Sequence, residues 1–368
     1  MIKILITSVG SLVGQNILDA LENRRKHLTI IGLNSIAESQ RMYRCDKAYL
    51  VQQTSSPEFV DTYQSIIQKE NPDLVLAGRD QDVVFLANYK KRAMGSKELI
   101  PVGEPYLAEM MLDKFKTHQF AEQHQLPYAA TFLYRNSLDT DGLQAFIATH
   151  GFPLLVKPRK GFGSINVFVV TNQQHVDMCI KDGDEVMFQE YLSPAEGLDL
   201  FVAQLKKGIP LSFQIPNHEH MVSQAVISRN GTLLDYISTK QTLVMGRTEY
   251  ARVYNDPDLN RMIELYAKNL TEKGWWGFLN LQSRRDKSGT WKVFELNPRL
   301  SGATSTRLNL GLDELGLLLN DEKPEWNFPL EIDPSRKQNH VFKYLTDHCV
   351  SDSDMEQFRT RGYWINNG

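Results

Sequence analysis

This sequence of 368 residues has few cysteines, a small net charge and few long hydrophobic runs. The three cysteines, at positions 45, 179 and 349, are far apart and lack metal-site spacing, which predicts reduced thiols in a cytosolic protein. A net charge of −3 argues against a broad nucleic-acid-binding surface. No apolar stretch approaches the roughly 20 residues that cross a bilayer. We therefore expect a soluble, cytoplasmic protein that binds neither nucleic acid nor membrane.

The N-terminal region also lacks the complete glycine signature of dinucleotide-binding proteins. Strand patterns at 2–6, 29–33, 48–51 and 74–77 alternate with helix patterns at 16–22 and 58–70, which is typical of a parallel sheet. Gly10 and Gly14 follow the first strand, but the third glycine is absent. Asn34 also stands where an acidic residue is expected. A tight turn between strand and helix explains these glycines more simply than the dinucleotide-binding site of an oxidoreductase does.

A second alternating section begins near Tyr106. It predicts one long helix over 107–123, strands at 152–157, 167–170 and 185–191, and helices at 173–180 and 258–273. The segment after about residue 320 predicts a loosely structured tail with one short strand and one helix. A chain of this length is expected to form two or three structural units.

The clearest chemical signal is a β-hairpin late in the chain. Ser288–Gly289 predicts a tight turn between two alternating strands, which places Gln282 opposite Glu295 and Asn280 opposite Asn297. These side chains then share one face of a sheet. Oxygen donors of this kind suit Mg²⁺, which takes few protein ligands and completes its shell with phosphates and water. A hairpin with a polar, solvated face would show the same alternation.

A second signal is the basic, glycine-containing segment Lys157–Ser164. It joins two strands, so it is not a P-loop, which opens a helix. Backbone N–H groups of such a turn can hold phosphate oxygens, and Lys157 at the end of an apolar run supplies a point charge. A basic surface hairpin is the alternative explanation.

A third, weaker signal is the irregular segment Ser193–Asp199, which follows the strand pattern at 187–192. Unpaired backbone groups at such a strand end can bind the edge of a nucleobase. Glu196 or Asp199 can accept hydrogen bonds from a ribose hydroxyl. An edge strand followed by a loop is the simpler explanation.

Taken in order, these segments resemble the ATP-grasp superfamily, in particular one synthetase module of the large subunit of carbamoyl phosphate synthetase. The resemblance covers about residues 1–312, and its most specific motif is Glu295–Gly302 with Asn280–Gln282 before it. Many ATP-grasp enzymes have an acidic residue at the position of Gln282, whereas the carbamoyl-phosphate type has glutamine. The segment Arg159–Gly163 departs from the family because it is bulkier and more basic than the usual glycine loop.

The resemblance implies an α/β chain with three parts. Residues 1–105 would form a Rossmann-like pre-ATP-grasp domain, and residues 106–320 a two-lobed ATP-grasp domain of α+β type with a lid lobe at about 125–190. Residues 321–368 would form a C-terminal extension.

The resemblance also implies residue roles and two cofactors, ATP and Mg²⁺. Gln282, Glu295 and Asn297 match the metal ligands, and Arg299 and Lys157 match the catalytic positions, with Arg299 on the transferred phosphate. The positions matching nucleotide-binding residues are Lys114, Lys157, Lys160, Gly161, Gly163, Ser164, Gln189, Glu190, Tyr191, Leu192, Glu196 and Asp199. For the ribose, the spacing favours Asp199 over Glu196.

The implied activity is that of an ADP-forming carboxylate–amine ligase, with small carboxylates and amines, including amino acids, as substrates. Complete carbamoyl phosphate synthesis is not expected, because that system pairs two modules and this chain has no recognisable glutaminase nucleophile. A catalytically silent nucleotide-binding module is the alternative. Arg247 is a candidate carboxylate anchor or simply part of a solvated connector. A homodimer is expected from the family alone.

Overall fold

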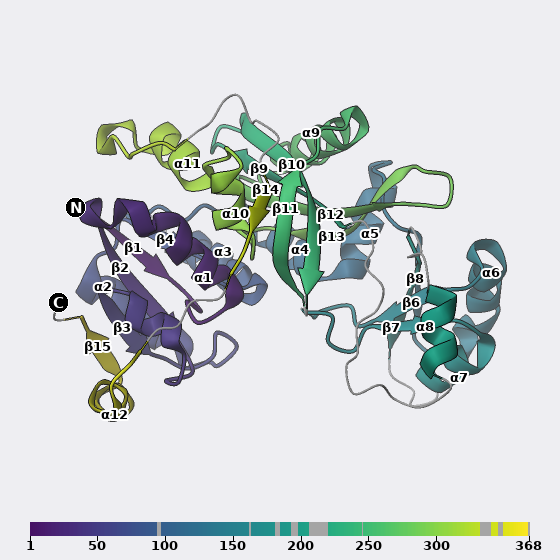
Figure 1. Cartoon of the computed structure of the whole chain (residues 1–368), viewed down its shortest axis with the longest axis horizontal. Coiled ribbons are helices and arrows are strands. Elements are labelled where there is room, and N and C mark those ends of the chain that lie inside the picture. The colour runs from purple at the N-terminus through teal and green to yellow at the C-terminus, as the bar shows by residue number, and fades with distance from the viewer. Residues whose placement is uncertain are drawn as a thin grey trace.

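The computed structural model arranges the chain around three β-sheets (Figure 1). It describes residues 1–93, 97–161, 163–180, 185–192, 198–205, 220–244, 246–331, 340–344 and 349–366. The N-terminal sheet lies at the left of Figure 1, the largest sheet at the centre and the smallest at the right.

The N-terminal sheet has the strand order β15-β3-β2-β1-β4. Its strands are β1 (Ile2–Ile6), β2 (Leu28–Asn34), β3 (Lys47–Leu50), β4 (Leu74–Leu76) and β15 (Tyr363–Ile365). The helical segments of this part are α1 (Leu12–Leu21), η1 (Glu22–His27), η2 (Gln40–Arg44), α2 (Phe59–Glu70) and α3 (Asp80–Arg92). Strands β1 to β4 run parallel, and the core of β1 is fully buried, as expected for a sheet covered on both faces.

The central sheet is antiparallel, with the order β13-β12-β9-β10-β11-β14. Its strands are β9 (His220–Ile227), β10 (Leu233–Val244), β11 (Arg247–Val253), β12 (Gly277–Arg285), β13 (Trp291–Asn297) and β14 (His340–Phe342). Helix α9 (Pro257–Thr271) packs on it; Asp256 caps the helix and Pro257 opens it, and both residue types favour a helix start. Helices α10 (Thr304–Asn309), α11 (Glu314–Glu322) and η4 (Pro324–Trp326) follow β13.

The smallest sheet has a hydrophobic core of its own, which makes it a separate lobe. Its order is β5-β8-β6-β7, with β5 (Thr131–Tyr134), β6 (Leu154–Lys157), β7 (Phe168–Val170) and β8 (Val186–Glu190). The helical segments beside it are η3 (Ser137–Asp139), α6 (Thr140–His150), α7 (Gln173–Ile180) and α8 (Leu198–Leu205). Leu143, Leu154 and Phe188 are fully buried within this lobe's apolar cluster.

The long helix expected over 107–123 is two helices, so that prediction is wrong. Helix α4 (Pro105–Leu112) ends before Asp113, and α5 (Lys114–Gln123) begins after it. Asp113 has an extended backbone, and its carboxylate accepts hydrogen bonds from the N–H groups of Phe115 and Lys116. An aspartate that satisfies free N–H groups of a new helix in this way is an N-cap, and it interrupts the helical run.

From residue 340 on, the described residues form two short strands and one helix, where the sequence predicts a loose tail with one short strand and one helix. After α12 (Asp352–Arg361), strand β15 pairs antiparallel with β3, and β14 pairs with β11. Each strand covers what would otherwise be an exposed sheet edge, which is favourable for both sheets. Lys343 also donates to the carbonyl of Gly302 at 3.2 Å and to the side chain of Asn16. The described part of this segment therefore ties the N-terminal and central sheets together.

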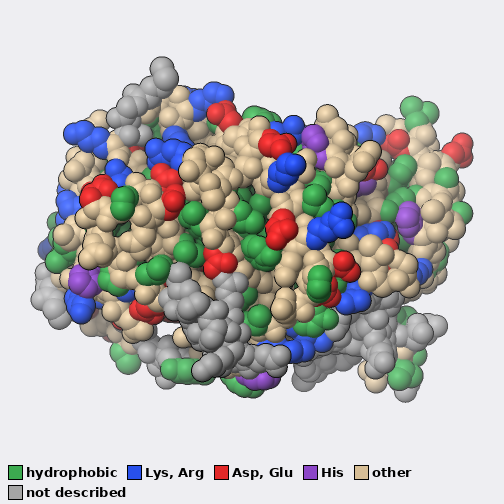
Figure 2. Space-filling view, turned by 90° about the horizontal axis from the view of Figure 1, so that it is seen from above, with side chains coloured by type: hydrophobic (Ala, Val, Ile, Leu, Met, Phe, Trp, Pro, Cys, Tyr) green, Lys and Arg blue, Asp and Glu red, His purple; other side chains and the backbone are tan. Residues whose placement is uncertain are grey.

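The described helices and one face of the molecule bear on how the protein meets its surroundings. None of the described helices is long and apolar enough to cross a membrane. Figure 2 shows basic and acidic side chains interspersed over the visible face.

Candidate active site

A cavity of about 270 Å³ lies between the smallest sheet and the central sheet. Its lining includes ten of the residues singled out from the sequence: Lys114, Lys157, Gly161, Gly163, Ser164, Gln189, Glu190, Tyr191, Leu192 and Glu295. Lys160 is exposed and does not line it. Glu196 lies outside the described residues, as does the side chain of Asp199, whose backbone is in the first turn of α8.

Lys157 is the buried cation of this cavity. It ends β6, is only 5% exposed, and donates from Nζ to Oε1 of Gln189 at 2.8 Å and to the carbonyl of Phe294 at 3.3 Å. Burial lowers the pKa of Lys157 to about 7, against the opposing effect of the carboxylate of Glu295. The positive charges of Lys114 and Arg284 also contribute to this lowered pKa. The ammonium group is therefore poised for an anionic ligand.

A β-bulge in the hairpin provides one of these contacts. Gln282 pairs with Glu295 and Asn280 with Asn297, which confirms the predicted register, but Ser283 pairs with Val293. The extra residue between them, Phe294, leaves its carbonyl available to Lys157 Nζ and to the hydroxyl of Tyr128. Bulges are frequent beside active sites because they redirect backbone groups in this way.

The basic loop after β6 is anchored at its start. Arg159 forms ion pairs with Asp113 at 2.6 Å and with Glu185 at 2.9 Å. Its carbonyl accepts from the N–H of Lys114 at 2.9 Å, and Lys114 Nζ donates to the carbonyl of Gly161 at 3.0 Å. Arg159, the first residue of the segment that departs from the family pattern, is therefore neutralised by carboxylates, while Gly161 and Gly163 lie on the cavity wall.

The strand end at β8 forms the opposite wall. Gln189 is fully buried and bonds Thr131 as well as Lys157. The carboxylate of Glu190 accepts from the N–H of Ala130 at 2.7 Å and pairs with Lys292 at 2.8 Å. This carboxylate therefore links β8 to the residue before β5 and to β13. The end of β8 can offer a ligand mainly its backbone groups.

The predicted metal ligands lie on one face of the β12–β13 hairpin. Gln282 and Glu295 are half-buried, and Asn297 is buried with its amide 3.5 Å from that of Asn280. No three His, Cys, Asp or Glu side chains gather in the described part of the chain. The donor set is one carboxylate and two amides, all hard oxygens. It fits a Mg²⁺ ion that takes further ligands from phosphates and water.

Arg299 stands just beyond this face and is held by the N-terminal part. Its Nη2 forms an ion pair with Asp80, the first residue of α3, at 2.7 Å, and its Nη1 donates to the carbonyl of Leu300 at 3.0 Å. The Nε atom is buried and has no partner among the described residues. One donor of a fixed guanidinium is therefore available beside Asn297, whose Oδ1 is 3.5 Å from Nη2.

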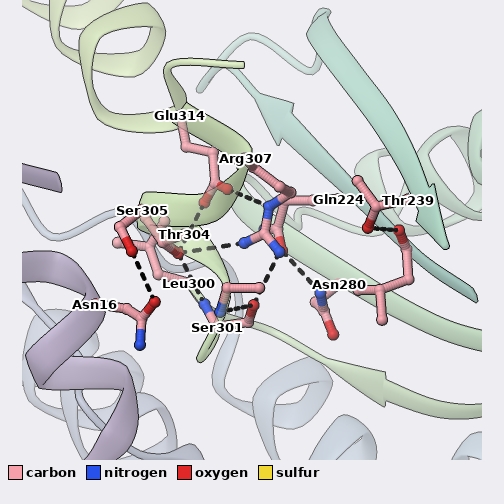
Figure 3. Close-up of polar contacts among 12 residues, drawn as sticks. Asn16, Gln224, Thr239, Asn280, Leu300, Ser301, Thr304, Ser305, Arg307 and Glu314 are labelled. Carbon is pink, nitrogen blue, oxygen red and sulfur yellow. Dashed lines mark hydrogen bonds and ion pairs between the residues drawn. The ribbon is translucent and has the colours of Figure 1, made fainter. Parts of the chain in front are cut away.

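A buried polar cluster positions the segment that follows Arg299 (Figure 3). Arg307 forms an ion pair with Glu314, both fully buried, and also donates to Ser301 Oγ at 3.0 Å and Thr304 Oγ1 at 3.2 Å. Burial raises the pKa of Glu314, and the charge of Arg307 opposes that rise. The guanidinium thus fixes the turn that connects β13 to α10.

Breaking this pair should be costly. Arg307→Met should lower the free energy of unfolding by about 3–5 kcal/mol, because it leaves the carboxylate of Glu314 buried without its counter-charge. The double variant Arg307→Met/Glu314→Leu should lose less than the single variant, which urea denaturation measures. Equal losses in the single and double variants would show that the pair is not the source of the effect.

Sequence reasoning missed several residues of the cavity. Arg284, Phe294, His220 and Leu243 line it, although none was assigned to the nucleotide site. Alternation along β12 carries a signal for Arg284, because it lies two residues after Gln282 and so on the same face. His220 and Leu243 come from the other strands of the central sheet, whose approach no local pattern indicates.

Comparisons by sequence give weak likenesses. No family model matches the chain. Phosphoribosylamine–glycine ligase of Vibrio vulnificus (strain YJ016) is 25% identical over 246 residues, 61% of this chain and 54% of that protein. The chain therefore spans about half the length of the curated relatives it matches.

Solved structures are similar over more of the chain. N5-carboxyaminoimidazole synthetase from Staphylococcus aureus, complexed with ADP, has a TM-score of 0.65 at 13% identity, over 87% of this chain and 76% of that one. Biotin carboxylase from Campylobacter jejuni, in a β-γ-ATP complex, has a TM-score of 0.63 at 13% identity, over 92% and 74%. These likenesses confirm the predicted fold class: the chain has the ATP-grasp fold.

Proposed function

We propose that this protein is an ATP- and Mg²⁺-dependent ligase that activates a carboxylate as an acylphosphate for attack by an amine. The observation that carries the proposal is one cavity in which Lys114, Lys157 and the glycine loop face Glu295. Glu295 is also paired in register with Gln282, so the cavity and the oxygen-donor face are continuous. Cations for phosphates and oxygens for a divalent ion thus meet at one place.

The residues suit phosphoryl transfer, which needs positioning and charge neutralisation more than covalent help from the protein. A carboxylate oxygen attacks the γ-phosphorus of ATP and the bond to ADP breaks; the amine nitrogen then attacks the acyl carbon and phosphate leaves. Lys114 and Lys157 hold the phosphates, and Arg299 neutralises charge on the group in transfer. Mg²⁺, held by Gln282, Glu295 and Asn297, would supply further neutralisation of the polyphosphate. Loop 159–164 would exclude water from the acylphosphate.

The carboxylate substrate has a candidate anchor at the start of β11. Arg247 is exposed. The pKa of Arg41 is lowered mainly by burial and also by the positive charge of Arg247. Arg41 donates to Gln15 Oε1 at 3.0 Å and to the carbonyl of Gly10. Two guanidinium groups close enough to repel each other, beside the N-terminal glycine turn, favour an anionic ligand there. We propose that this is where the carboxylate substrate binds.

The glutamine in the metal set supports the finer resemblance to a carbamoyl phosphate synthetase module. Gln282 contributes a neutral oxygen where a carboxylate would add a second negative charge. The site therefore has fewer acidic groups than one with a carboxylate at position 282. The positive charges of Lys157 and Arg284 can then balance the negative charge of a nucleotide.

A trapping assay tests the proposed reaction. Hydroxylamine can replace the natural amine and converts an acylphosphate into a hydroxamate, so pools of amino acids and other small carboxylates can be screened with ATP and Mg²⁺. We expect one class of carboxylate to give hydroxamate together with equal amounts of ADP and phosphate. If the protein binds ADP but no carboxylate stimulates ATP cleavage, it is a silent nucleotide-binding module instead.

ADP affinity should fall as the pH rises above 7. In the free protein the pKa of Lys157 is about 7, so this lysine is mostly neutral at pH 8. Phosphates favour the charged form, and binding therefore takes up a proton and weakens by up to about tenfold per pH unit above 7. Calorimetry in two buffers of different ionisation enthalpy measures this uptake. Lys157→Arg, which stays charged, should bind ADP without it, and zero uptake by the wild type at pH 8 would contradict the assignment.

A further inference from the structure

Arg284 is a half-buried cation, and the described residues around it supply no counter-charge within ion-pair distance. Its side chain lies on β12 and lines the cavity, with the guanidinium 5.2 Å from the centre of the Phe294 ring. The Nε atom is buried and has no hydrogen-bond partner among the described residues. No carboxylate of those residues lies within ion-pair distance of this arginine, whereas its neighbour Arg285 pairs with Asp256 at 3.1 Å.

The cavity as a whole has an excess of positive charge. Arg284, Lys157 and Lys114 line it together with two glutamates, Glu295 and Glu190, and the carboxylate of Glu190 is already paired with Lys292 at 2.8 Å. Burial lowers the pKa of Arg284 to about 10, so it remains charged at neutral pH, and its charge in turn lowers the pKa of Lys157. A charge that is partly removed from water without a partner costs stability. Such a group is retained more readily where a ligand supplies its counter-charge.

We propose that Arg284 is a nucleotide-binding residue whose counter-charge is supplied by the phosphates of the bound nucleotide. The inference rests on the proposed function, because it takes the cavity to be the nucleotide site. A guanidinium forms paired hydrogen bonds with phosphate oxygens, and the face that packs on Phe294 leaves the edge of the group free for them. This contact is additional to those of Lys114 and Lys157.

Arg284→Met separates the ligand contact from a structural role. It removes an unpaired, half-buried charge, so the melting temperature of the unliganded variant should equal or exceed that of the wild type. Its affinity for ADP in the presence of Mg²⁺ should fall at least about tenfold, equivalent to 1.4 kcal/mol. Arg284→Lys should retain more ADP affinity than Arg284→Met. The matched control Arg285→Met, on the opposite face, should bind ADP like the wild type.

Adenosine, which lacks phosphates, identifies the part of the ligand that Arg284 contacts. Competition against ADP should give the same adenosine affinity for the wild type and Arg284→Met. Unchanged ADP affinity in Arg284→Met, or equal losses for ADP and adenosine, would overturn the inference while leaving the proposed function in place. A wild-type protein that binds no ADP would instead remove the proposed function, and this inference with it.

Discussion

Arg299→Ala should bind ADP with nearly wild-type affinity and lose turnover by about a hundredfold to a thousandfold. That range corresponds to about 2.7–4 kcal/mol, the cost of removing one positioned donor from a developing charge. The guanidinium is fixed by Asp80 and by the carbonyl of Leu300, so its free Nε needs no reorganisation during the reaction. Steady-state turnover with the best carboxylate from the hydroxylamine screen measures the effect, and calorimetry measures the binding.

Two further variants check that assignment. Asp80→Asn keeps the shape of the partner but removes its charge, so Arg299 loses its ion pair and turnover should fall by less than in Arg299→Ala. Arg299→Lys should be a poor substitute, because an ammonium group cannot reproduce the fixed fork of a guanidinium. If Arg299→Ala has wild-type turnover, this residue does not act on the transferred phosphate.

Glu295→Ala should abolish Mg²⁺-dependent ADP release. Glu295 is the single carboxylate of the predicted metal set, and a bound divalent ion contributes several kcal/mol of charge stabilisation in such reactions. A loss of that size corresponds to at least about a thousandfold in rate. The removal should also lower the pKa of Lys157, because the charge of Glu295 raises it. The proton uptake on ADP binding should therefore begin at a lower pH than in the wild type.

The control for this prediction is an acidic residue that faces solvent and does not line the cavity. Glu272, exposed after α9, can be replaced by alanine with no expected effect on ADP release. Gln282→Glu, which adds a carboxylate to the set, should keep Mg²⁺ dependence and lower the Mg²⁺ concentration needed for half activity. Full activity of Glu295→Ala at ordinary Mg²⁺ concentration would exclude this glutamate as a metal ligand.

Local patterns predicted the parts of the site that depend on one strand or one turn. The register of Gln282 with Glu295 follows from the period of two and from a short turn, and the structure reproduces it. The burial of Lys157 could likewise be predicted, because this lysine ends an apolar strand. These features need no knowledge of distant segments.

The remainder depends on features that such patterns do not carry. The Asp113 cap divides a helix whose apolar spacing continues on both sides, and the bulge at Phe294 shifts a register by one residue. The pairing of β14 and β15 depends on sheet edges more than 80 residues away in sequence. Arg284 could have been placed by alternation, but its lack of a counter-charge becomes evident only when the cavity walls come together.

The central claim is that oxygen donors on the β12–β13 hairpin and the cations around Lys157 together bind a magnesium nucleotide. Calorimetric titration of ADP into the wild-type protein, in Mg²⁺ and then in excess chelator, tests it most directly. The account predicts clearly tighter binding with Mg²⁺, and loss of that difference in Glu295→Ala. Equal ADP affinity with and without the metal, or a Mg²⁺ effect that persists in Glu295→Ala, would contradict it.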